Sequence, residues 1–118
     1  MNINVSISNR IAKVEVEGRL DVNSAPLFHK EMASIDLNLI DAVEMDFFGV
    51  GYVSSVGLRE FIILKKRLGE KKLRLEKVSP LVDEIFRATC FDTILDYSVG
   101  MPGNVTRSLT ASFSPTCA

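Results

Sequence analysis

Apolar and polar residues alternate over two neighbouring segments at the start of the chain. Ile3, Val5 and Ile7 alternate with polar residues, and the alternation resumes over residues 11–17. A period of two is typical of a strand that buries one face. The short polar link Ser8-Asn9-Arg10 between the segments predicts a turn, so we expect an opening β-hairpin.

From residue 23 onward, helical and strand periodicities take turns. A first helix is expected after Asn23 or Ser24, either of which can cap it, with Pro26 in its first turn and a stripe of Phe28, Met32, Ile35 and Leu39. Residues 41–47 alternate as a third strand, and residues 48–54 are expected to form a loop.

The second half repeats this alternation. We expect a helix over about residues 55–68, ended by Gly69 in the left-handed αL conformation, a strand over 72–78, and a helix capped by Ser79 with Pro80 at its first position. Leu81 or Val82, with Ile85 and Phe86, should form the buried stripe of that helix, and Ile94 and Leu95 could begin a last strand. The order β-β-α-β-α-β-α(-β) predicts an α/β domain: one mixed sheet of four or five strands with helices packed against it.

Composition adds limits to this picture. The 118 residues carry a net charge of −1 and 47% apolar residues, which fits one globular domain over residues 1–99. Residues 100–118 are rich in Ser and Thr without periodicity, so we expect a flexible tail. Interspersed charges of both signs argue against a nucleic-acid surface.

The expected location is the cytoplasm. The N-terminus lacks the basic and apolar regions of a signal peptide, and the longest apolar stretch, residues 61–64, is too short to enter a membrane as a spanning helix. Neither Cys90 nor Cys117 belongs to a C-x-x-C motif, and His29 is the single histidine. We therefore expect no metal site and no cofactor.

The segment around Gly49 and Gly51 offers little for catalysis. A dinucleotide-binding loop would need glycine at position 54, and the Gly-Lys-Ser/Thr ending of a P-loop is absent. A nucleophile elbow around Ser55 would need glycine where Val53 stands, with His29 as base and Asp21 as its orienting carboxylate. Asp21 and Asp46, at strand ends, could act as acid–base groups, but turn and cap roles are the more common ones.

Ser54 and Ser55 stand where the second helix should begin. A serine there normally caps the helix through its hydroxyl. It is also a good phosphate acceptor, because the helix dipole and the free N–H groups tolerate negative charge. Both roles stay open from the residues alone.

Two faces are expected on the same helix. Leu58, Phe61, Ile62, Leu64 and Leu68 should form the buried face, whereas Val56 and Ile63 fall among Arg59, Glu60, Lys66 and Arg67. The second face is either a docking surface or a set of isolated surface apolar residues of the ordinary kind.

The chain resembles the STAS family of bacterial anti-sigma factor antagonists over roughly residues 3–97. The resemblance lies in Gly18-Arg19-Leu20-Asp21, Asp46, the run Val50-Gly51-Tyr52-Val53-Ser54-Ser55-Val56-Gly57-Leu58-Arg59, and Val78-Ser79-Pro80. It implies a single STAS-like domain, and it implies a non-enzymatic partner switch. In that family the unmodified antagonist binds an anti-sigma factor that is a serine kinase, phosphorylation releases it, and a phosphatase resets it.

On this motif Ser55 is the phosphate acceptor. The resemblance implies a partner-binding set of Asp21, Tyr52, Ser54, Ser55, Val56, Arg59 and Ile63. Ser54 stands where aspartate is common and competes as a site of phosphorylation; Val56, Cys90 and the tail also depart from the family pattern. A STAS scaffold in a lipid-transport or stressosome-like assembly remains an alternative, as does, from the enzyme class, a small esterase or nucleotide hydrolase using Ser55.

Overall fold

The computed structural model describes residues 1–100; the expected tail, apart from Gly100, lies outside the described residues. Five strands are present: β1 (Asn2–Ser8), β2 (Ile11–Leu20), β3 (Ala42–Val53), β4 (Lys72–Val78) and β5 (Asp96–Val99). The helices are α1 (Ala25–Ala33), α2 (Ser55–Leu68) and α3 (Pro80–Ala88), with short 3-10 turns at Leu37–Leu39 and Phe91–Thr93. None of the helices in this part of the chain is long and apolar enough to cross a membrane.

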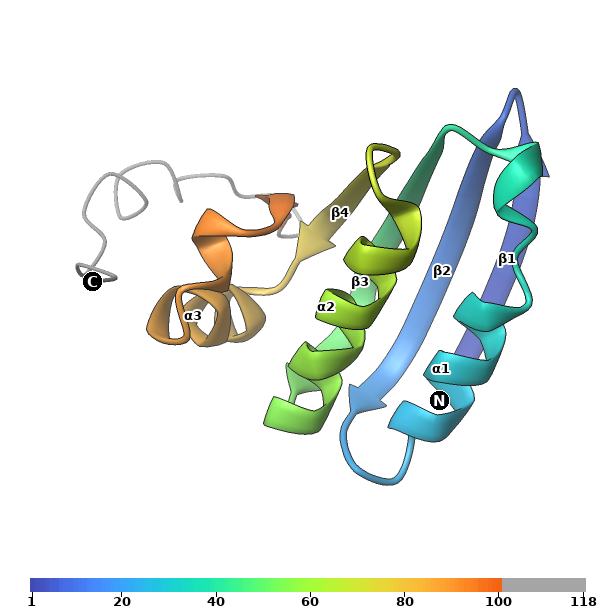
Figure 1. Cartoon of the computed structure of the whole chain (residues 1–118). Helices are drawn as coiled ribbons and strands as arrows, with labels where there is room; N and C mark the ends of the chain where they lie inside the picture. The colour runs from blue at the N-terminus through green and yellow to red at the C-terminus, as the bar shows by residue number, and fades with distance from the viewer. Residues whose placement is uncertain (101–118) are drawn as a thin grey trace.

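The strands form one mixed sheet in the order β1-β2-β3-β4-β5, of which Figure 1 labels β1 to β4. Strands β1 and β2 pair antiparallel, and each later pair is parallel. The hairpin turn holds Asn9 and Arg10 at positive φ, the geometry of the tight turns that follow the twist of the strands. The predicted mixed α/β sheet with its opening hairpin is therefore confirmed, and the fifth strand begins at Asp96, just after Ile94 and Leu95.

The core lies between the sheet and its helices. Helices α1 and α2 lie side by side against the sheet, and α3 follows β4 (Figure 1). Phe61 of α2 is fully buried and joins three elements: its ring centroid lies 5.8 Å from that of Phe28 in α1, 5.7 Å from Phe47 in β3 and 6.0 Å from Phe86 in α3. Burial of this aromatic group fixes α2 between its neighbours.

Three helix boundaries were predicted closely. Helix α2 begins at Ser55 and ends before Gly69, and α3 begins at Pro80, where the Ser79 hydroxyl accepts a hydrogen bond from the Val82 amide (3.2 Å). Gly69 has the expected positive φ of 61°, but its ψ of −116° lies outside the αL region. In α3, Val82 and Phe86 are buried, whereas Leu81 points to solvent.

The loop predicted over residues 48–54 is wrong. Strand β3 continues to Val53 because its pairing with β2 continues, from Gly49 beside Glu17 to Val53 beside Leu20. Two register shifts interrupt this pairing, so the buried residues Val50 and Val53 do not follow a strict alternation. A β-bulge of this kind hides a strand from a period-two search.

The first helix is shorter than its predicted stripe. It ends at Ala33, where the Ser34 hydroxyl donates to the Glu31 carbonyl (2.7 Å). The Asp36 side chain then accepts from the Asn38 amide and starts a 3-10 turn, which leaves Leu39 52% exposed. The expected burial of Leu39 is therefore wrong, while Phe28, Met32 and Ile35 are buried as predicted.

Candidate switch site at the start of helix α2

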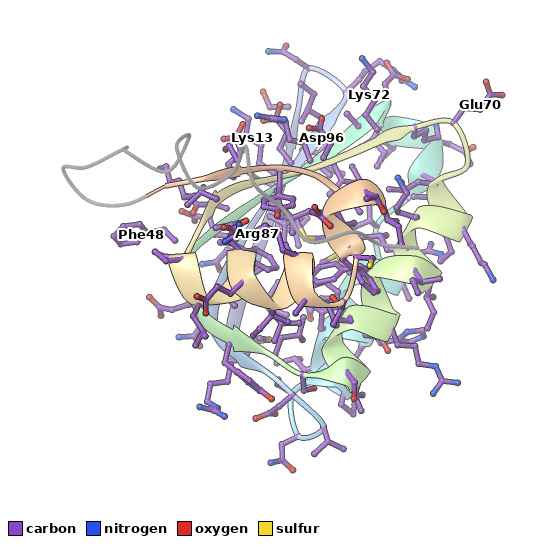
Figure 2. All side chains as sticks on the ribbon, turned by 90° about the vertical axis from the view of Figure 1, so that its left-hand side faces the viewer. Lys13, Phe48, Glu70, Lys72, Arg87 and Asp96 are labelled. Atoms are coloured by element: carbon purple, nitrogen blue, oxygen red, sulfur yellow. The ribbon has the colours of Figure 1, made fainter. Side chains whose placement is uncertain are left out.

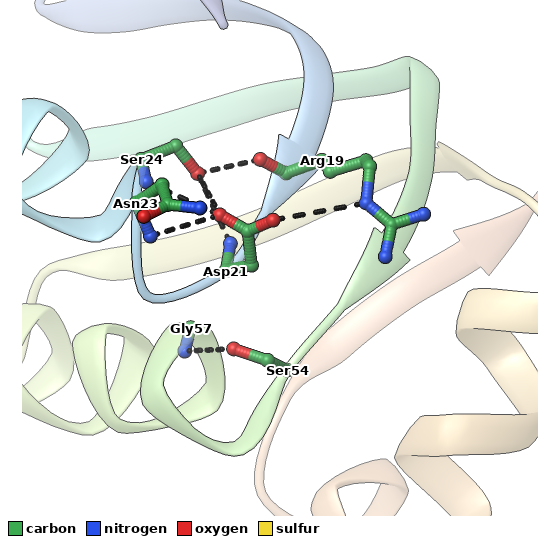
Figure 3. Close-up of polar contacts among 6 residues, drawn as sticks. All are labelled: Arg19, Asp21, Asn23, Ser24, Ser54 and Gly57. Carbon is green, nitrogen blue, oxygen red and sulfur yellow. Dashed lines mark hydrogen bonds and ion pairs between the residues drawn. The ribbon is translucent and has the colours of Figure 1, made fainter.

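The ends of β2 and β3 bring the predicted site residues to one edge of the sheet. Leu20 and Val53 are paired in the parallel ladder, and the Ser54 amide donates to the Leu20 carbonyl (2.8 Å). Asp21 follows directly after Leu20, and Ser55 directly after Ser54. Carboxyl ends of parallel strands share an edge, so the turn after β2 and the start of α2 lie next to each other (Figure 3).

The backbone at the start of α2 approaches the backbone at the end of β2 closely. Gly57 is buried in the first turn of α2, and a Cβ atom there would lie 2.7 Å from both the carbonyl oxygen and Cγ of Leu20. Only glycine leaves room for the helix start to reach the end of β2 at this distance. The glycine in the Ser-Val-Gly segment is therefore required by packing.

Ser54 is the cap of the helix. Its φ and ψ of −87° and 175° are extended, its hydroxyl accepts from the Gly57 amide (3.2 Å; Figure 3), and its carbonyl accepts from the Leu58 amide (2.8 Å). This is the standard N-cap geometry, and the side chain is half-buried. The hydroxyl of Ser54 thus already has a structural role.

Ser55 occupies the first position of the helix proper. Its side chain is exposed, and its hydroxyl makes no hydrogen bond within residues 1–100. At this position the amides of the first helical turn have no acceptor within the helix. The hydroxyl of Ser55 is therefore accessible at the positive end of a helix, without a competing structural role.

The Asp21 carboxylate organises the turn between β2 and α1. Its Oδ1 accepts from the amides of Asn23 (3.0 Å) and Ser24 (3.2 Å; Figure 3). Partial burial acts to raise the pKa of Asp21, but these hydrogen bonds, the Ser24 hydroxyl and the Arg19 charge together hold it below its usual value. The turn role weighed for Asp21 is the one that the geometry supports.

Ser24 departs from the expected capping role. It is the residue before α1, but its hydroxyl does not cap that helix. It donates to the Arg19 carbonyl (2.5 Å) and accepts from the Asp21 amide (3.0 Å), which ties the turn back to β2.

Arg19 is part of the site although it was not among the predicted partner-binding residues. Its guanidinium lies 4.6 Å above the ring centroid of Tyr52, and its Nε is 3.7 Å from Asp21 Oδ2. Arg19 and Tyr52 are lateral neighbours in the ladder. The contact between Arg19 and Tyr52 follows from the register of β2 and β3 across a bulge, and this register cannot be deduced from the pattern of apolar and polar residues.

Two of the α2 assignments need correction. Ile62, predicted to be buried, is 37% exposed, whereas Ile63 is half-buried in a narrow crevice with His29, Met32 and Arg67. The reason is α1, which packs beside α2: Arg67 Nη1 donates to the Met32 carbonyl (2.9 Å) across this seam. Val56 (36% exposed) and Arg59 are exposed as expected.

The residues required for a serine nucleophile are engaged elsewhere. His29 Nδ1 lies 2.9 Å from Glu60 Oε1, in the middle of α2, and Asp21 accepts from its own turn. Asp46 lies inside β3 rather than at a strand end, and its Oδ1 accepts from the Phe48 amide (2.9 Å) where the pairing with β2 shifts register. Within residues 1–100 no three or more His, Cys, Asp or Glu side chains gather where they could hold a metal ion.

The geometry agrees with what comparison with known proteins gives. The model of the STAS domain family matches residues 2–107. The chain belongs to the STAS domain family. Among relatives, the anti-sigma-B factor antagonist of Bacillus subtilis strain 168 is 30% identical over 111 residues, covering 89% of this chain and 99% of that protein.

Solved structures share the STAS fold at low identity. An anti-sigma factor antagonist from Mycobacterium paratuberculosis superposes with a TM-score of 0.74 at 21% identity, covering 93% of this chain and 92% of that one. The anti-sigma factor antagonist SpoIIAA, in its unphosphorylated form, gives a TM-score of 0.63 at 12% identity, covering 94% and 96% of the two chains. The phosphorylated form of SpoIIAA, described as a Bacillus cell fate determinant, gives 0.62 at 10% identity, covering 94% and 98%.

Cys90 departs from the STAS pattern and has an unusual backbone conformation. Cys90, where the family usually has glycine, follows α3 with φ 65° and ψ 16°, the left-handed conformation that glycine adopts most easily. The backbone at Cys90 therefore has a conformation that glycine favours, although the side chain is that of cysteine.

Proposed function

We propose that this STAS protein is an anti-sigma factor antagonist that binds an anti-sigma factor serine kinase when unmodified and is released when Ser55 is phosphorylated. A phosphatase then resets the switch, in the cytoplasm. The observation that carries the proposal is the division of roles at the start of α2, where Ser54 caps the helix and Ser55 is exposed and uncommitted.

The position of Ser55 suits a reversible modification. A phosphate adds about −1.5 to −2 charges at neutral pH. At a helix N-terminus such charge is favourable by roughly 0.3–1 kcal/mol when exposed. The domain should therefore tolerate the phosphate, and the change should act on whatever protein contacts this edge.

The surrounding residues suit partner binding better than catalysis. Val56 and Arg59 present apolar and charged groups beside Ser55, and the Arg19–Tyr52 contact adds an aromatic ring and a further positive charge at the end of the sheet. The anti-sigma factor antagonists named above carry the same fold, which supports this partner class. Asp21 contributes by holding the turn next to the binding surface.

Site mapping tests the proposal. The protein is incubated with the anti-sigma factor kinase and ATP, and phosphate is located by mass spectrometry in wild type, Ser54→Ala and Ser55→Ala. We expect labelling of wild type and Ser54→Ala and none of Ser55→Ala, with Ser55→Ala still bound by the kinase. Labelling confined to Ser54 would transfer the acceptor role to that residue and contradict the proposal.

A second measurement separates the proposal from the scaffold alternative. Unmodified protein and Ser55→Ala are used to recover partners from the source cells. Retention of a kinase-like anti-sigma factor is the expected result. Retention of a transporter ATPase or of a large stressosome-like assembly would assign the STAS domain to a scaffold instead.

A further inference from the structure

Helix α2 presents a stripe of residues that no part of the described chain covers. Ser55, Arg59, Ile62 and Lys66 are spaced at i, i+4, i+7 and i+11, and all four are exposed. This spacing places them on one line along a helix. The buried residues Leu58, Phe61, Leu64 and Leu68 occupy the opposite side. We call the four exposed residues the outer stripe.

The charge of the outer stripe has one sign. Arg59 and Lys66 make no ion pair within residues 1–100, and Lys65 and Arg67, also exposed, extend the positive charge at the end of the helix. The one acidic residue of α2, Glu60, is bound to His29 on the side facing α1. A chain with a net charge of −1 thus concentrates unpaired positive charge along the helix that begins at the switch serine.

An apolar residue sits between the two cations. Ile62 is 37% exposed, although burial of its side chain against the sheet would have been favourable. An isolated exposed isoleucine needs no explanation, but here it lies between two unpaired cations on the same line as Ser55. Apolar contact surrounded by charge is the usual composition of a protein interface.

We propose that the outer stripe docks against an acidic surface of the anti-sigma factor, with Ile62 entering an apolar depression between the partner's carboxylates. The proposal rests on the function proposed above and adds the chemistry of the partner. Charge complementarity selects this occupant, because unpaired Arg59 and Lys66 would be met by carboxylates and would repel a basic surface.

This chemistry also explains how a phosphate would release the partner. Phosphoserine 55 would add about −1.5 to −2 charges one helical turn from Arg59. That charge nearly cancels the two cations of the stripe and directly faces the partner's carboxylates. Attraction is thereby replaced by repulsion at the same surface, without any change of fold.

Charge reversal tests the inference. The affinity of the unmodified protein for the purified anti-sigma factor is measured by calorimetric titration from about 0.05 to about 0.5 M salt, a range over which surface charges become screened. The variants are Arg59→Glu and Lys66→Glu. The control is Lys72→Glu, which makes the same change in charge at an exposed lysine at the start of β4 (Figure 2). Melting temperatures verify that each variant folds.

We expect wild-type affinity to fall as salt rises, and each stripe variant to bind about tenfold or more weakly with a flatter salt dependence, while Lys72→Glu behaves as wild type. Unchanged affinity of both stripe variants, or equal losses in Lys72→Glu, would overturn the inference and leave the proposed function standing. No binding by wild type would reject the proposed function itself. Self-association of the purified protein that Arg59→Glu or Lys66→Glu abolishes would assign the stripe to a second copy, against the proposal.

Discussion

The adjacent residues Ser54 and Ser55 differ in structural role, because Ser54 lies just before α2 and Ser55 is the first residue of that helix. Ser54 lies just outside α2, where its hydroxyl can fold back onto the Gly57 amide, and Ser55 lies inside the helix, where its hydroxyl cannot. One serine therefore caps the helix while the hydroxyl of the other stays accessible. The residues alone left both roles open for the pair, and the resemblance to the STAS family implied Ser55 as the phosphate acceptor with Ser54 as a competing site. Which serine caps the helix depends on the exact residue at which α2 starts.

The two alanine variants should separate these roles in stability. Ser54→Ala removes the cap and should lower the free energy of unfolding by about 1 kcal/mol. Ser55→Ala removes an exposed hydroxyl that has no hydrogen-bond partner among residues 1–100, and it should change the free energy of unfolding by less than about 0.5 kcal/mol. Denaturant unfolding of both variants measures the difference. Equal costs, or a larger cost for Ser55→Ala, would mean that the cap is assigned to the wrong serine.

Asp21 should make folding sensitive to acid. Its pKa is lowered in the folded protein by hydrogen bonds and the Arg19 charge, after opposition from burial. A lowered carboxylate pKa stabilises the fold at pH values above the unfolded pKa of about 3.9, and this contribution is lost as pH falls through the folded pKa.

Asp21→Asn provides the comparison, since asparagine keeps an acceptor oxygen without the charge. The stability advantage of wild type over Asp21→Asn should be constant between about pH 7 and about pH 5.5 and should shrink below about pH 4. Urea unfolding across this range measures it. An advantage that stays the same down to pH values where wild type unfolds would contradict the lowered pKa.

At the scale of elements, the junction of β2 and α2 depends on Gly57. Gly57→Ala would force a Cβ atom to within 2.7 Å of the Leu20 carbonyl, which belongs to backbone held in the sheet. We expect a loss of about 1–3 kcal/mol in the free energy of unfolding, as for other overpacked sites. Gly51→Ala is the matched control, because a Cβ atom there meets nothing within 4 Å. Similar stability of the two variants would show that the junction is looser than described.

The last strand is tied to α3 by a hydrogen bond between side chains. Tyr97 Oη donates to Oδ1 of the buried Asp83 (2.8 Å), and burial, followed by this carboxylate, raises the pKa of Tyr97. A raised folded pKa means that the contribution is fully present below the unfolded pKa of about 10 and is lost as pH rises above it.

Tyr97→Phe should therefore be less stable than wild type by about 1 kcal/mol at pH 7, since a buried acceptor loses a donor. The difference in stability between wild type and Tyr97→Phe should shrink as pH rises above about 10. Above this pH, Tyr97 loses its proton more easily in the unfolded chain than in the folded protein, which favours unfolding of wild type only. Unfolding by urea at pH 7 and at about pH 11 provides the test. A difference that grows at alkaline pH would refute the direction of the shift.

Helices and strands with regular periods and strong caps were predictable, and irregular ones were not. Ser79-Pro80 and Gly69 mark the ends of α3 and α2 because caps act locally. The second half of β3 was missed because bulges break its alternation, and the exchange of Ile62 and Ile63 followed from α1 packing beside α2. Both depend on contacts between distant segments, which periodicity does not describe.

At the scale of the whole molecule, the site is built on the edge of a rigid layer. The strand ends that position Asp21 and Ser54 belong to the centre of a five-stranded sheet, and Phe61 anchors α2 to α1, β3 and α3. Ser55, the proposed phosphate acceptor, lies outside this core, on the side of α2 that faces solvent. A charge added at Ser55 should therefore change the affinity for a partner and leave the packing of the core intact.

The expected free energies also indicate that a phosphate on Ser55 acts on binding more than on the fold. Within the domain, a phosphate on Ser55 is worth roughly 0.3–1 kcal/mol of stabilisation through the helix terminus. At an interface, desolvating it without matched cations would cost several kcal/mol. About 1.4 kcal/mol is a tenfold change in affinity, so the interface effect should exceed the effect on the fold.

The most direct test compares unmodified and Ser55-phosphorylated protein in two measurements on the same samples: calorimetric titration with the anti-sigma factor, and thermal melting. We predict that phosphorylation weakens binding by about a hundredfold or more while the melting temperature stays nearly unchanged. Equal affinity of the two forms, or a loss of binding that accompanies collapse of the fold, would contradict it.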